Sequence, residues 1–376
     1  MSEKIWANSG DSHLVEPEDI WQTSMPSRLA DRMPRSVKDP DGQWETIYVD
    51  GQQWRRRMPR PGTIGVPVGF DPDTQEHAPG ANDPDLRLKD LDQEGVWGEV
   101  IYPSLGIWAH NIGDPHLLRE GSRALNDWAI AFQNHSSRYV CAAAVPLLDI
   151  DDAVAEVQRT AGLGIHIAFF PTKEPFGRPP FQSAEWEPLW SAMEEASMVV
   201  GFHIGVEPHT PDKRTAVIHR GPGGALLNFG ENTFGVQRCT MQMIASGVLD
   251  RHPNLKVLNS EGGATWGPLI ADRLDEAYRA HGAAVQPRLS KLPSEYLYSQ
   301  VYATFQHDRS AIPTHTAMGW RNVMWGSDYP HHEGTYPHTQ KVLHELFDDI
   351  GPEASHRIRI GAFCDLFPHV PPIPGA

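Results

Sequence analysis

The stretch Asn-Val-Met-Trp-Gly-Ser-Asp-Tyr-Pro-His, residues 322–331, ends a short apolar run abruptly in Asp328. Strands that are buried on both faces read as continuous apolar runs, so residues 322–327 predict a buried strand with a carboxylate at its carboxyl end. In (β/α)8 barrels the catalytic groups collect at that end of the strands. Asp328 is therefore the first candidate for a functional residue.

Similar apolar runs recur along the chain. Polar residues follow three of them directly: Asp11 and His13 after the first, His203 after the fifth, and Glu261 after the sixth. Together with the run above they predict eight strands, at 5–10, 99–103, 139–146, 164–170, 198–202, 255–260, 300–305 and 322–327.

Helical periodicity separates many of these runs. Strands that alternate with helices indicate a parallel sheet, and eight of them favour closure into a barrel. An open doubly wound sheet is the alternative, but it normally carries a Gly-rich phosphate-binding turn after an early strand, and the sequence lacks one. We therefore predict an α/β fold, a (β/α)8 TIM barrel in a single domain over 1–376, with helices at 121–134, 151–161, 183–196, 240–250, 264–280 and 339–347.

Two long insertions are expected, after strands 1 and 5. The first, residues 14–95, is rich in Pro, Trp and Arg, and its segment 44–54 predicts a hairpin around an Asp-Gly turn. The second, residues 204–232, is rich in Gly, Pro and His. Both begin at the functional rim, so we expect walls or lids over the site; a surface ornament or dimer contact is the alternative for the first. Residues 370–376 form a Pro-rich tail.

Composition indicates a cytoplasmic enzyme that acts on small molecules. The chain of 376 residues exceeds a bare barrel of roughly 250, and its net charge of −16 disfavours nucleic acid and anionic membrane surfaces as partners. No apolar run approaches the ~18 residues of a membrane span, and the start of the sequence lacks the layout of a signal peptide. Three scattered cysteines indicate neither a disulfide framework nor a zinc knuckle. A homo-oligomer is possible.

The residues at the strand ends predict a metal site. Asp11, His13, His203 and Asp328 supply two carboxylates and two imidazoles from three strands, and a barrel brings all strand ends to one rim. Such donors suit one divalent ion, zinc or manganese, that can activate water or polarise a substrate oxygen. Singly, each residue could instead be a satisfied structural group or a cap.

The chain resembles the amidohydrolase superfamily, specifically the amidohydrolase 2 group related to aminocarboxymuconate-semialdehyde decarboxylase. The resemblance extends from Asp11-Ser12-His13-Leu14-Val15-Glu16-Pro17 to about Pro368, and its most specific part is Trp325-Gly326-Ser327-Asp328-Tyr329-Pro330-His331. Phe202-His203-Ile204-Gly205 and the segment 252–263 are also similar. The resemblance implies a metal-dependent (β/α)8 barrel in which His203 and Asp328 are metal ligands.

The sequence departs from that group at two positions. The first strand of the family usually ends in His-x-His, whereas here Asp11 stands in place of an imidazole, as it does in some decarboxylases of the group. Decarboxylases of the group commonly place a histidine before Gly-Gly after the sixth strand, whereas this chain has Glu261. A carboxylate there can act as a general acid or base.

Further candidates follow from their positions at the rim. His307 comes after the seventh strand and is predicted to contact substrate and act in catalysis, with a structural role as the alternative. Arg238, His331 and His332 are candidates for substrate binding, because an anionic substrate needs positive charge and metal ligands need supporting partners. Glu16 is the substitute should Asp11 not be a ligand.

The sequence thus predicts a metal-dependent enzyme with Glu261, Asp328 and His307 as catalytic residues. Its leading function is decarboxylation of a small aromatic or unsaturated carboxylic acid, which the resemblance favours. Metal-dependent hydrolysis of an amide, ester, lactone or C–C bond is the alternative, which Glu261 favours. A metal-free barrel that only binds ligands is a third reading.

Overall fold

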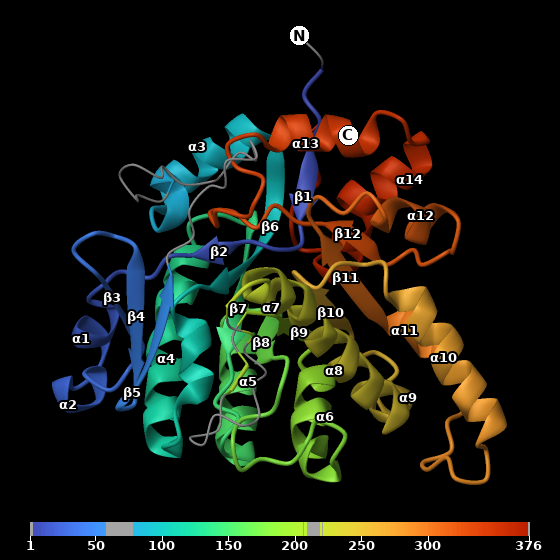
Figure 1. Cartoon of the computed structure of the whole chain (residues 1–376), viewed down its shortest axis with the longest axis horizontal. Coiled ribbons are helices and arrows are strands. Elements are labelled where there is room, and N and C mark those ends of the chain that lie inside the picture. Colours follow the sequence, from blue (N-terminus) through green and yellow to red (C-terminus); the bar gives the residue numbers. More distant parts are fainter. Residues whose placement is uncertain (1–2, 58–77, 206, 209–218, 220, 375–376) are drawn as a thin grey trace.

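Eight parallel strands form a nearly closed barrel in the computed structural model (Figure 1). The structure describes residues 3–57, 78–205, 207–208, 219 and 221–374. The strands follow one another around the barrel in chain order: β1 (Ala7–Ser9), β6 (Val96–Pro103), β7 (Tyr139–Ala144), β8 (Ile167–Pro171), β9 (Val199–His203), β10 (Val257–Ser260), β11 (Val301–Phe305) and β12 (Val323–Trp325). The predicted TIM barrel and all eight predicted strands are confirmed.

The two ends of the sheet meet between β12 and β1. The backbone N–H of Gly10 donates to the carbonyl of Trp325 at 2.9 Å. Beyond the strands, the N–H of Asp328 donates to the carbonyl of Asp11 at 2.9 Å, and Ser12 pairs with Tyr329 in a parallel bridge. The first and last strand ends, which both carry predicted site residues, are thereby held against each other.

Both faces of the barrel strands are buried, as their continuous apolar sequences predict. Along β6, Val100 and Tyr102 belong to one hydrophobic cluster and Ile101 to the other. The same alternation places Val140 in the cluster of Val100 and Tyr102, and Cys141 in the cluster of Ile101. Successive side chains of a strand point to opposite faces, so one cluster contains the side chains that point into the barrel, and the other contains those that pack between the strands and the outer helices.

The outer helices occupy the segments that the periodicity predicts: α4 (Pro115–Gln133), α5 (Ile150–Ala161), α6 (Glu187–Glu195), α8 (Phe234–Ala245) with α9 (Val248–Arg251), α10 (Gly267–Ala280) and α13 (Thr339–Phe347). The prediction missed α3 (Pro84–Glu94), α7 (Gly224–Asn232), α11 (Pro293–Gln300), α12 (Ala311–Thr316), α14 (Pro352–His356) and α15 (Ala362–Leu366). Helix α3 has a readable start: Asp83 accepts hydrogen bonds from the N–H groups of Asp85 and Leu86, and Pro84 follows the cap.

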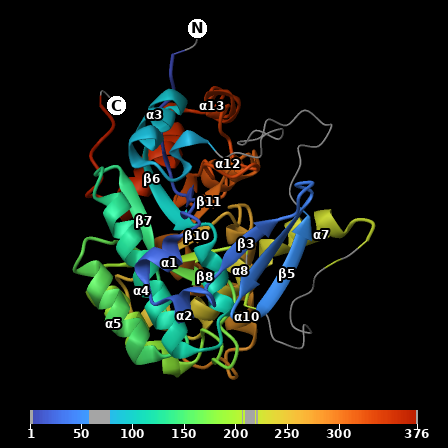
Figure 2. The ribbon, with the colours of Figure 1, turned by 90° about the vertical axis from the view of Figure 1, so that its left-hand side faces the viewer.

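Between β1 and β6 the chain forms β2 (His13–Leu14), α1 (Ile20–Ser24), α2 (Ser27–Ala30) and a separate antiparallel sheet of β3 (Arg35–Lys38), β4 (Trp44–Val49) and β5 (Gln52–Arg57). Val49 pairs with Gln52 across the turn, which confirms the predicted hairpin. This sheet and α7 project from the same side of the barrel (Figure 2). Residues 206, 209–218 and 220 of the predicted second insertion lie outside the described residues. In the tail, Val370 and Ile373 are buried.

Candidate metal centre

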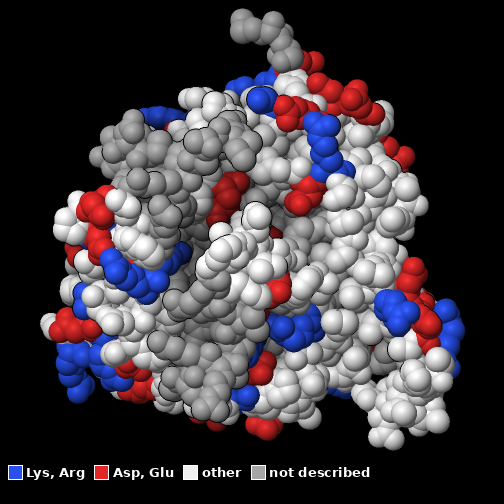
Figure 3. Space-filling view, in the orientation of Figure 1, with Lys and Arg blue, Asp and Glu red and all other residues white. Residues whose placement is uncertain are grey.

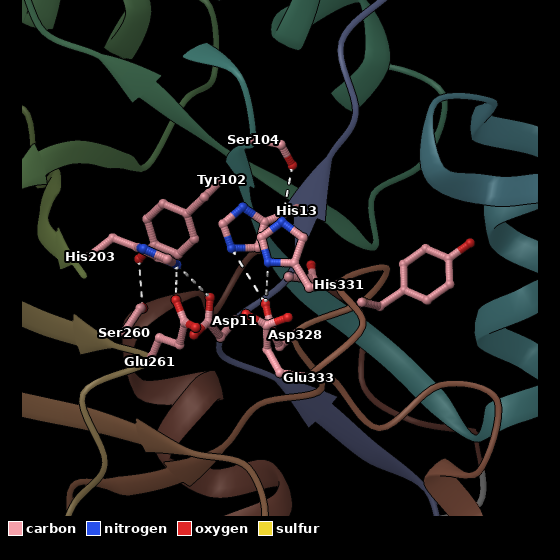
Figure 4. A network of polar contacts seen from close by, with 12 residues as sticks. Asp11, His13, Tyr102, Ser104, His203, Ser260, Glu261, Asp328, His331 and Glu333 are labelled. Atoms are coloured by element: carbon pink, nitrogen blue, oxygen red, sulfur yellow. Dashed lines mark hydrogen bonds and ion pairs between the residues drawn. The ribbon is translucent and has the colours of Figure 1, made fainter. Parts of the chain in front are cut away.

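The predicted ligands meet at the carboxyl ends of the strands (Figure 4). Asp11 follows β1, His13 begins β2, His203 ends β9 and Asp328 lies just beyond β12. All four are at most 2% exposed. Figure 3 shows that this face of the molecule is hollowed near its middle, with acidic side chains inside the hollow.

The close approach of the first and last strands depends on Gly326. A Cβ atom at this position would lie 2.8 Å from the Cβ of Asp11, a contact that real side chains do not tolerate without a shift. The glycine in the Trp-Gly-Ser-Asp sequence therefore brings the Asp11 and Asp328 segments together, which explains its place next to the site.

Backbone carbonyls fix the orientation of both imidazoles. The Nδ1 of His13 lies 3.1 Å from the carbonyl oxygen of Pro103, and the Nδ1 of His203 lies 2.6 Å from that of Ile204. A carbonyl can only accept, so each Nδ1 carries a proton. The Nε2 of His13 then keeps its lone pair for a cation, and the Nε2 of His203, which bonds to Asp11 Oδ1, can bind one when it gives up its proton. A carbonyl partner at Nδ1 is typical of metal-bound histidines.

The side chains form a continuous group of potential ligands. The Nε2 of His203 lies 3.3 Å from Asp11 Oδ1 and 3.7 Å from Glu261 Oε2. The Nε2 of His13 lies 3.5 Å from Asp328 Oδ1. Asp11, His13 and His203 offer ligand atoms that all lie within 4.8 Å of one another, and so do His13, Asp328 and His331. The structure thus places Asp328 beside His13, and His13 links it to the other two predicted ligands.

Two of the site carboxylates have a left-handed backbone. Glu261 has a φ of 60° and Asp328 a φ of 54°, a conformation that costs a non-glycine residue about 1–3 kcal/mol. Each is held by a hydrogen bond: Glu261 N–H donates to Thr304 Oγ1, and Asp328 N–H to the carbonyl of Asp11, both at 2.9 Å. Such strain clusters at functional sites, and here it turns two carboxylates toward the mouth of the barrel.

The surroundings shift the pKa of the two imidazoles in opposite directions. Burial lowers the pKa of His13 well below its usual value, and His331 and His203 lower it further. Burial would also lower the pKa of His203, but the carboxylates of Asp11 and Glu261 raise it to about 9. The carboxylates therefore favour positive charge at the Nε2 of His203, which is the atom that would bind a metal ion.

Glu261 and Asp328 are buried beside other carboxylates, and this raises the pKa of both. Burial, together with the charge of Asp328, raises the pKa of Glu261 well above its usual value. Burial, Glu333 and Asp11 raise the pKa of Asp328 in the same way. Burial would raise the pKa of Glu333 too, but its hydrogen bond from His332 lowers it to about 2.

The donor set fits a divalent ion. Among the described residues, His13 Nε2 and both carboxylate oxygens of Asp328 are buried and have no hydrogen-bond partner in good geometry. Buried polar atoms of native proteins are nearly always satisfied, so a cation is the partner that explains all three atoms. Two imidazole nitrogens with carboxylate oxygens suit zinc or manganese.

A buried ion pair that the sequence analysis missed holds His13 in place. Arg87, from α3, binds both carboxylate oxygens of Glu99 at 2.5 and 2.9 Å and donates to the carbonyl of His13 at 2.8 Å. Ser12 Oγ donates to the same carboxylate at 2.8 Å. Arg87 lies inside the unassigned 14–95 segment, so only the polar Glu99 within an apolar strand could have signalled this cluster.

Tyr102 supports His203 from inside the barrel. The two rings pack with their centroids 4.6 Å apart, and the Tyr102 hydroxyl bonds to Ser260 Oγ at 2.8 Å. Tyr102 is an inward-facing residue of β6, and the alternation along that strand was a signal for it.

The loop after β12 brings three more side chains to the centre. His331 stacks on His13 with ring centroids 3.8 Å apart, and its Nδ1 lies 3.1 Å from Asp328 Oδ1. The Nε2 of His331 contacts Ser104 Oγ at 3.2 Å. His332 Nδ1 lies 2.7 Å from Glu333 Oε2. His331 thus lies in the cluster itself, while His332 reaches it through Glu333.

Three other candidates lie outside these ligand groups. His307 is exposed, and its Nε2 is 3.3 Å from the carbonyl of Glu333. Arg238, in α8, pairs with Glu207 at 2.5 Å and donates to the carbonyl of Thr172. Glu16 accepts hydrogen bonds from the N–H groups of Leu105 and Gly106 at 2.9 and 2.7 Å, which occupies both of its oxygens. The roles of His307 and Arg238 stay predictions.

Solved structures with the same fold include several amidohydrolases and decarboxylases. An amidohydrolase from Mycobacterium avium subsp. paratuberculosis K-10 is 20% identical, with a TM-score of 0.76 over 97% of this chain and 100% of that one. The 5-carboxyvanillate decarboxylase LigW from Sphingomonas paucimobilis is 17% identical, with a TM-score of 0.67 over 96% and 99% of the chains. A dihydroxybenzoic acid decarboxylase from Polaromonas sp. JS666, with bound manganese and the inhibitor 2-nitroresorcinol, is 17% identical, with a TM-score of 0.64 over 96% and 97%.

The sequence itself decides the family. No curated protein matches the chain. The family model described as amidohydrolase matches residues 105–361, well over half of the sequence, and that segment contains His203, Glu261 and Asp328. In the described part of the chain, no helix is long and apolar enough to cross a membrane. The chain therefore belongs to the amidohydrolase family and is an enzyme of that family.

Proposed function

We propose that this enzyme is a metal-dependent carboxy-lyase that removes carbon dioxide from a small aromatic or unsaturated carboxylic acid. The observation that carries the proposal is the buried cluster at the barrel mouth, in which His13 Nε2 and the Asp328 oxygens need a cationic partner. The reaction class comes from the structural neighbours, several of which are decarboxylases of aromatic acids.

Asp11, His13, His203 and Asp328 would hold one divalent ion per chain, zinc or manganese. Bound there, the ion would supply a Lewis acid that orients an oxygen of the substrate. Asp328 would join the other ligands through the side on which it already contacts His13. The manganese bound to the Polaromonas relative makes manganese the first ion to test.

Glu261 is the proposed acid. Its side chain is 13% exposed, so it can reach a substrate in the hollow while it remains beside His203. When the C–C bond to the carboxylate breaks, its electron pair stays on the substrate carbon and carbon dioxide leaves. That carbon then needs a proton, which the carboxyl group of Glu261 can donate. The resulting carboxylate regains a proton from solvent before the next turnover.

The remaining candidates are proposed to shape the substrate pocket. His331 and His332 lie next to the cluster and can bind an oxygen of the substrate, while His307 and Arg238 lie farther out on the rim. We also propose that the segments after β1 and β9 form walls of the pocket, because the β3–β4–β5 sheet and α7 lie on one side of the barrel (Figure 2).

Hydrolysis of an amide, ester, lactone or C–C bond is the second candidate. Glu261 favours it, because a carboxylate next to a metal site can accept a proton from an attacking water as a general base. The two functions differ in their use of water: hydrolysis incorporates its oxygen into the product, whereas decarboxylation takes only a proton from solvent.

One panel of substrates separates these functions. The manganese-loaded enzyme is incubated with aromatic and unsaturated carboxylic acids, and with their esters and amides, in water enriched in oxygen-18. Release of carbon dioxide, with deuterium entering the vacated carbon in heavy water, supports the carboxy-lyase. Incorporation of oxygen-18 without release of carbon dioxide supports the hydrolase. A His203→Ala variant serves as the inactive control.

A further inference from the structure

A cavity of about 590 Å³ lies at the start of the first barrel strand, at the opposite end of β1 from Asp11. The first residues of the chain, α13, the segment after α14 and the tail surround it, and these parts meet at one end of the molecule (Figure 1). Its apolar walls are Ile5, Trp6, Ile360, Ile373 and Pro374. This volume, with a largely apolar lining and a few polar groups, is typical of a site for a small molecule.

Arg359 brings a positive charge to this cavity without a carboxylate partner. Its Nε donates to Ser355 Oγ at 2.9 Å and its Nη1 to the carbonyl of Trp6, whereas its Nη2 has no hydrogen bond from the described residues. No carboxylate among these residues pairs with it, although Arg357, two positions earlier, lies 2.7 Å from Asp365. Burial lowers the pKa of the Arg359 guanidinium. An anion at Nη2 would supply the missing negative charge.

The backbone at Arg359 is a π-helix, η4 (Arg357–Gly361), which joins α14 to α15. π-Helices are rare, and they occur mostly as single turns within helices and frequently at functional sites. The guanidinium also lies 5.9 Å from the ring of Phe347 in α13. The contacts with Trp6, Ser355 and Phe347 therefore hold the guanidinium in place, while Nη2 stays available to a ligand.

The other charged side chains leave the cavity open to an anion. Lys4 has no ion pair among the described residues, and its Nζ donates only to a backbone carbonyl, at 2.8 Å. Asp348 places its two oxygens 2.9 and 3.1 Å from His344 Nδ1, and Glu3 is exposed. The two fixed positive charges, on Lys4 and Arg359, thus face one exposed carboxylate and one that a histidine already binds.

We propose that this cavity is a binding site for a small organic carboxylate, separate from the metal centre. The carboxylate would accept a hydrogen bond from Nη2 of Arg359, and such a charge-assisted bond is stronger than one between neutral groups. The apolar body of the ligand would lie against Trp6, Ile360 and Ile373. An inorganic anion would leave these walls without a partner, and a neutral molecule would leave the guanidinium without a counter-charge. The site goes beyond the proposed reaction, and none of its residues is a proposed metal ligand.

Titration with benzoate tests the proposal, because benzoate joins a carboxylate to a flat apolar ring. Calorimetry is carried out on the full-length, manganese-loaded protein. Arg359→Gln should lose one benzoate per chain, with an affinity lower by about ten-fold or more, the usual effect of losing a hydrogen bond to a charged group. Arg321→Gln is the matched control, because Arg321 is exposed and already pairs with Glu353, and it should bind benzoate as the parent does. His203→Ala should also keep this benzoate, which distinguishes it from any benzoate at the metal centre.

A second pair of variants is needed, because Arg359→Gln also loses the hydrogen bond to Trp6. Ile373→Glu leaves Arg359 in place and adds a carboxylate to the cavity wall, so it should bind benzoate more weakly than Ile373→Gln, which has the same shape without the charge. Benzoate binding that is unchanged in Arg359→Gln, or equal in Ile373→Glu and Ile373→Gln, would overturn the site. Equally tight binding of benzamide or of inorganic phosphate would overturn the assigned ligand chemistry. None of these results bears on the carboxy-lyase, which is tested by the release of carbon dioxide.

Discussion

The two ends of the barrel each hold a cluster of histidine and carboxylates, and the clusters differ in how completely their atoms are paired. At the amino end of β10, His252 places Nδ1 2.9 Å from Glu194 Oε2 and Nε2 3.0 Å from Glu187 Oε1. Arg251 donates to the other oxygen of Glu187, and the N–H of Asn254 donates to the other oxygen of Glu194. At the carboxyl end, His13 Nε2 and the Asp328 oxygens have no such partners among the described residues.

The pKa values of the carboxylates shift in opposite directions in the two clusters. The hydrogen bonds from Arg251 lower the pKa of Glu187. Burial would raise the pKa of Glu194, but the N–H of Asn254 and His252 lower it. At the mouth, burial and neighbouring charge raise the pKa of both Glu261 and Asp328. Residue types alone do not distinguish the two clusters; the pairing of their atoms does.

The largest expected effect comes from removing a ligand at the mouth. His203→Ala or Asp328→Ala should leave a folded protein with little bound metal and no measurable turnover, since each loss removes charge and geometry from the metal site. Metal content by mass spectrometry and the rate of product formation check this. Full metal content in both variants would contradict the ligand assignment.

The matched change at the other end is His252→Ala. It should keep metal and turnover, but it should lower the free energy of unfolding by about 1–3 kcal/mol, because Glu187 and Glu194 lose a partner. A metal-deficient His252→Ala would mean that the two ends are coupled, and the comparison would then fail.

A smaller loss is expected when only the proton-transfer capacity is removed. Glu261→Gln keeps the shape of the side chain, and we expect turnover to fall by about 10²–10⁴-fold, the usual contribution of a positioned acid or base. The ion held by Asp11, His13 and His203 should stay. Turnover within a few-fold of the parent would show that Glu261 is structural, and His307 would become the next candidate.

A still smaller change is expected from Asp11→His, which restores the more usual residue of the family. It exchanges an oxygen ligand for a nitrogen and removes one negative charge, so the preference should move from manganese toward zinc without loss of fold. Competition between the two ions for the stripped protein measures it. An unchanged ratio would remove Asp11 from the ligands, although Glu16 could not replace it while it binds Leu105 and Gly106.

The barrel was predictable because its signals are local and repeated. Each strand is a short apolar run. Consecutive residues such as Val100, Ile101 and Tyr102 are all apolar and point alternately to the two buried faces. Helices α3 and α11 were not predicted, because neither has a long apolar stripe along one face. Their starts depend on caps and prolines, such as Asp83 with Pro84, which are short signals that also occur in turns.

The site was only partly predictable. The strand-end positions of Asp11, His13, His203 and Asp328 predicted that these side chains would lie together, because a barrel brings those ends together whatever their separation in sequence. Arg87 escaped, because its contact with the carbonyl of His13 spans 74 residues and leaves no local pattern. Sequence also cannot say that Glu16 is already occupied by backbone N–H groups, because this depends on where residues 105 and 106 lie.

The smallest expected effect concerns how stability changes with pH, and the two ends should differ in sign. A carboxylate whose folded pKa is lowered, such as Glu194, stabilises the protein above its unfolded pKa of about 4.5, and this stabilisation is lost as the pH falls through the folded value. Glu194→Gln should therefore destabilise the protein at pH 7, and the difference from the parent should vanish in acid.

Glu261 has a raised folded pKa, so its stabilising effect is present below about pH 4.5 and is lost as the pH rises. In metal-stripped protein, Glu261→Gln should match the parent at low pH and become the more stable of the two at pH 7. Thermal unfolding of both variants and the parent between pH 4 and 8 measures this, and differences of the same sign at the two ends would refute the contrast between a paired and an unpaired cluster.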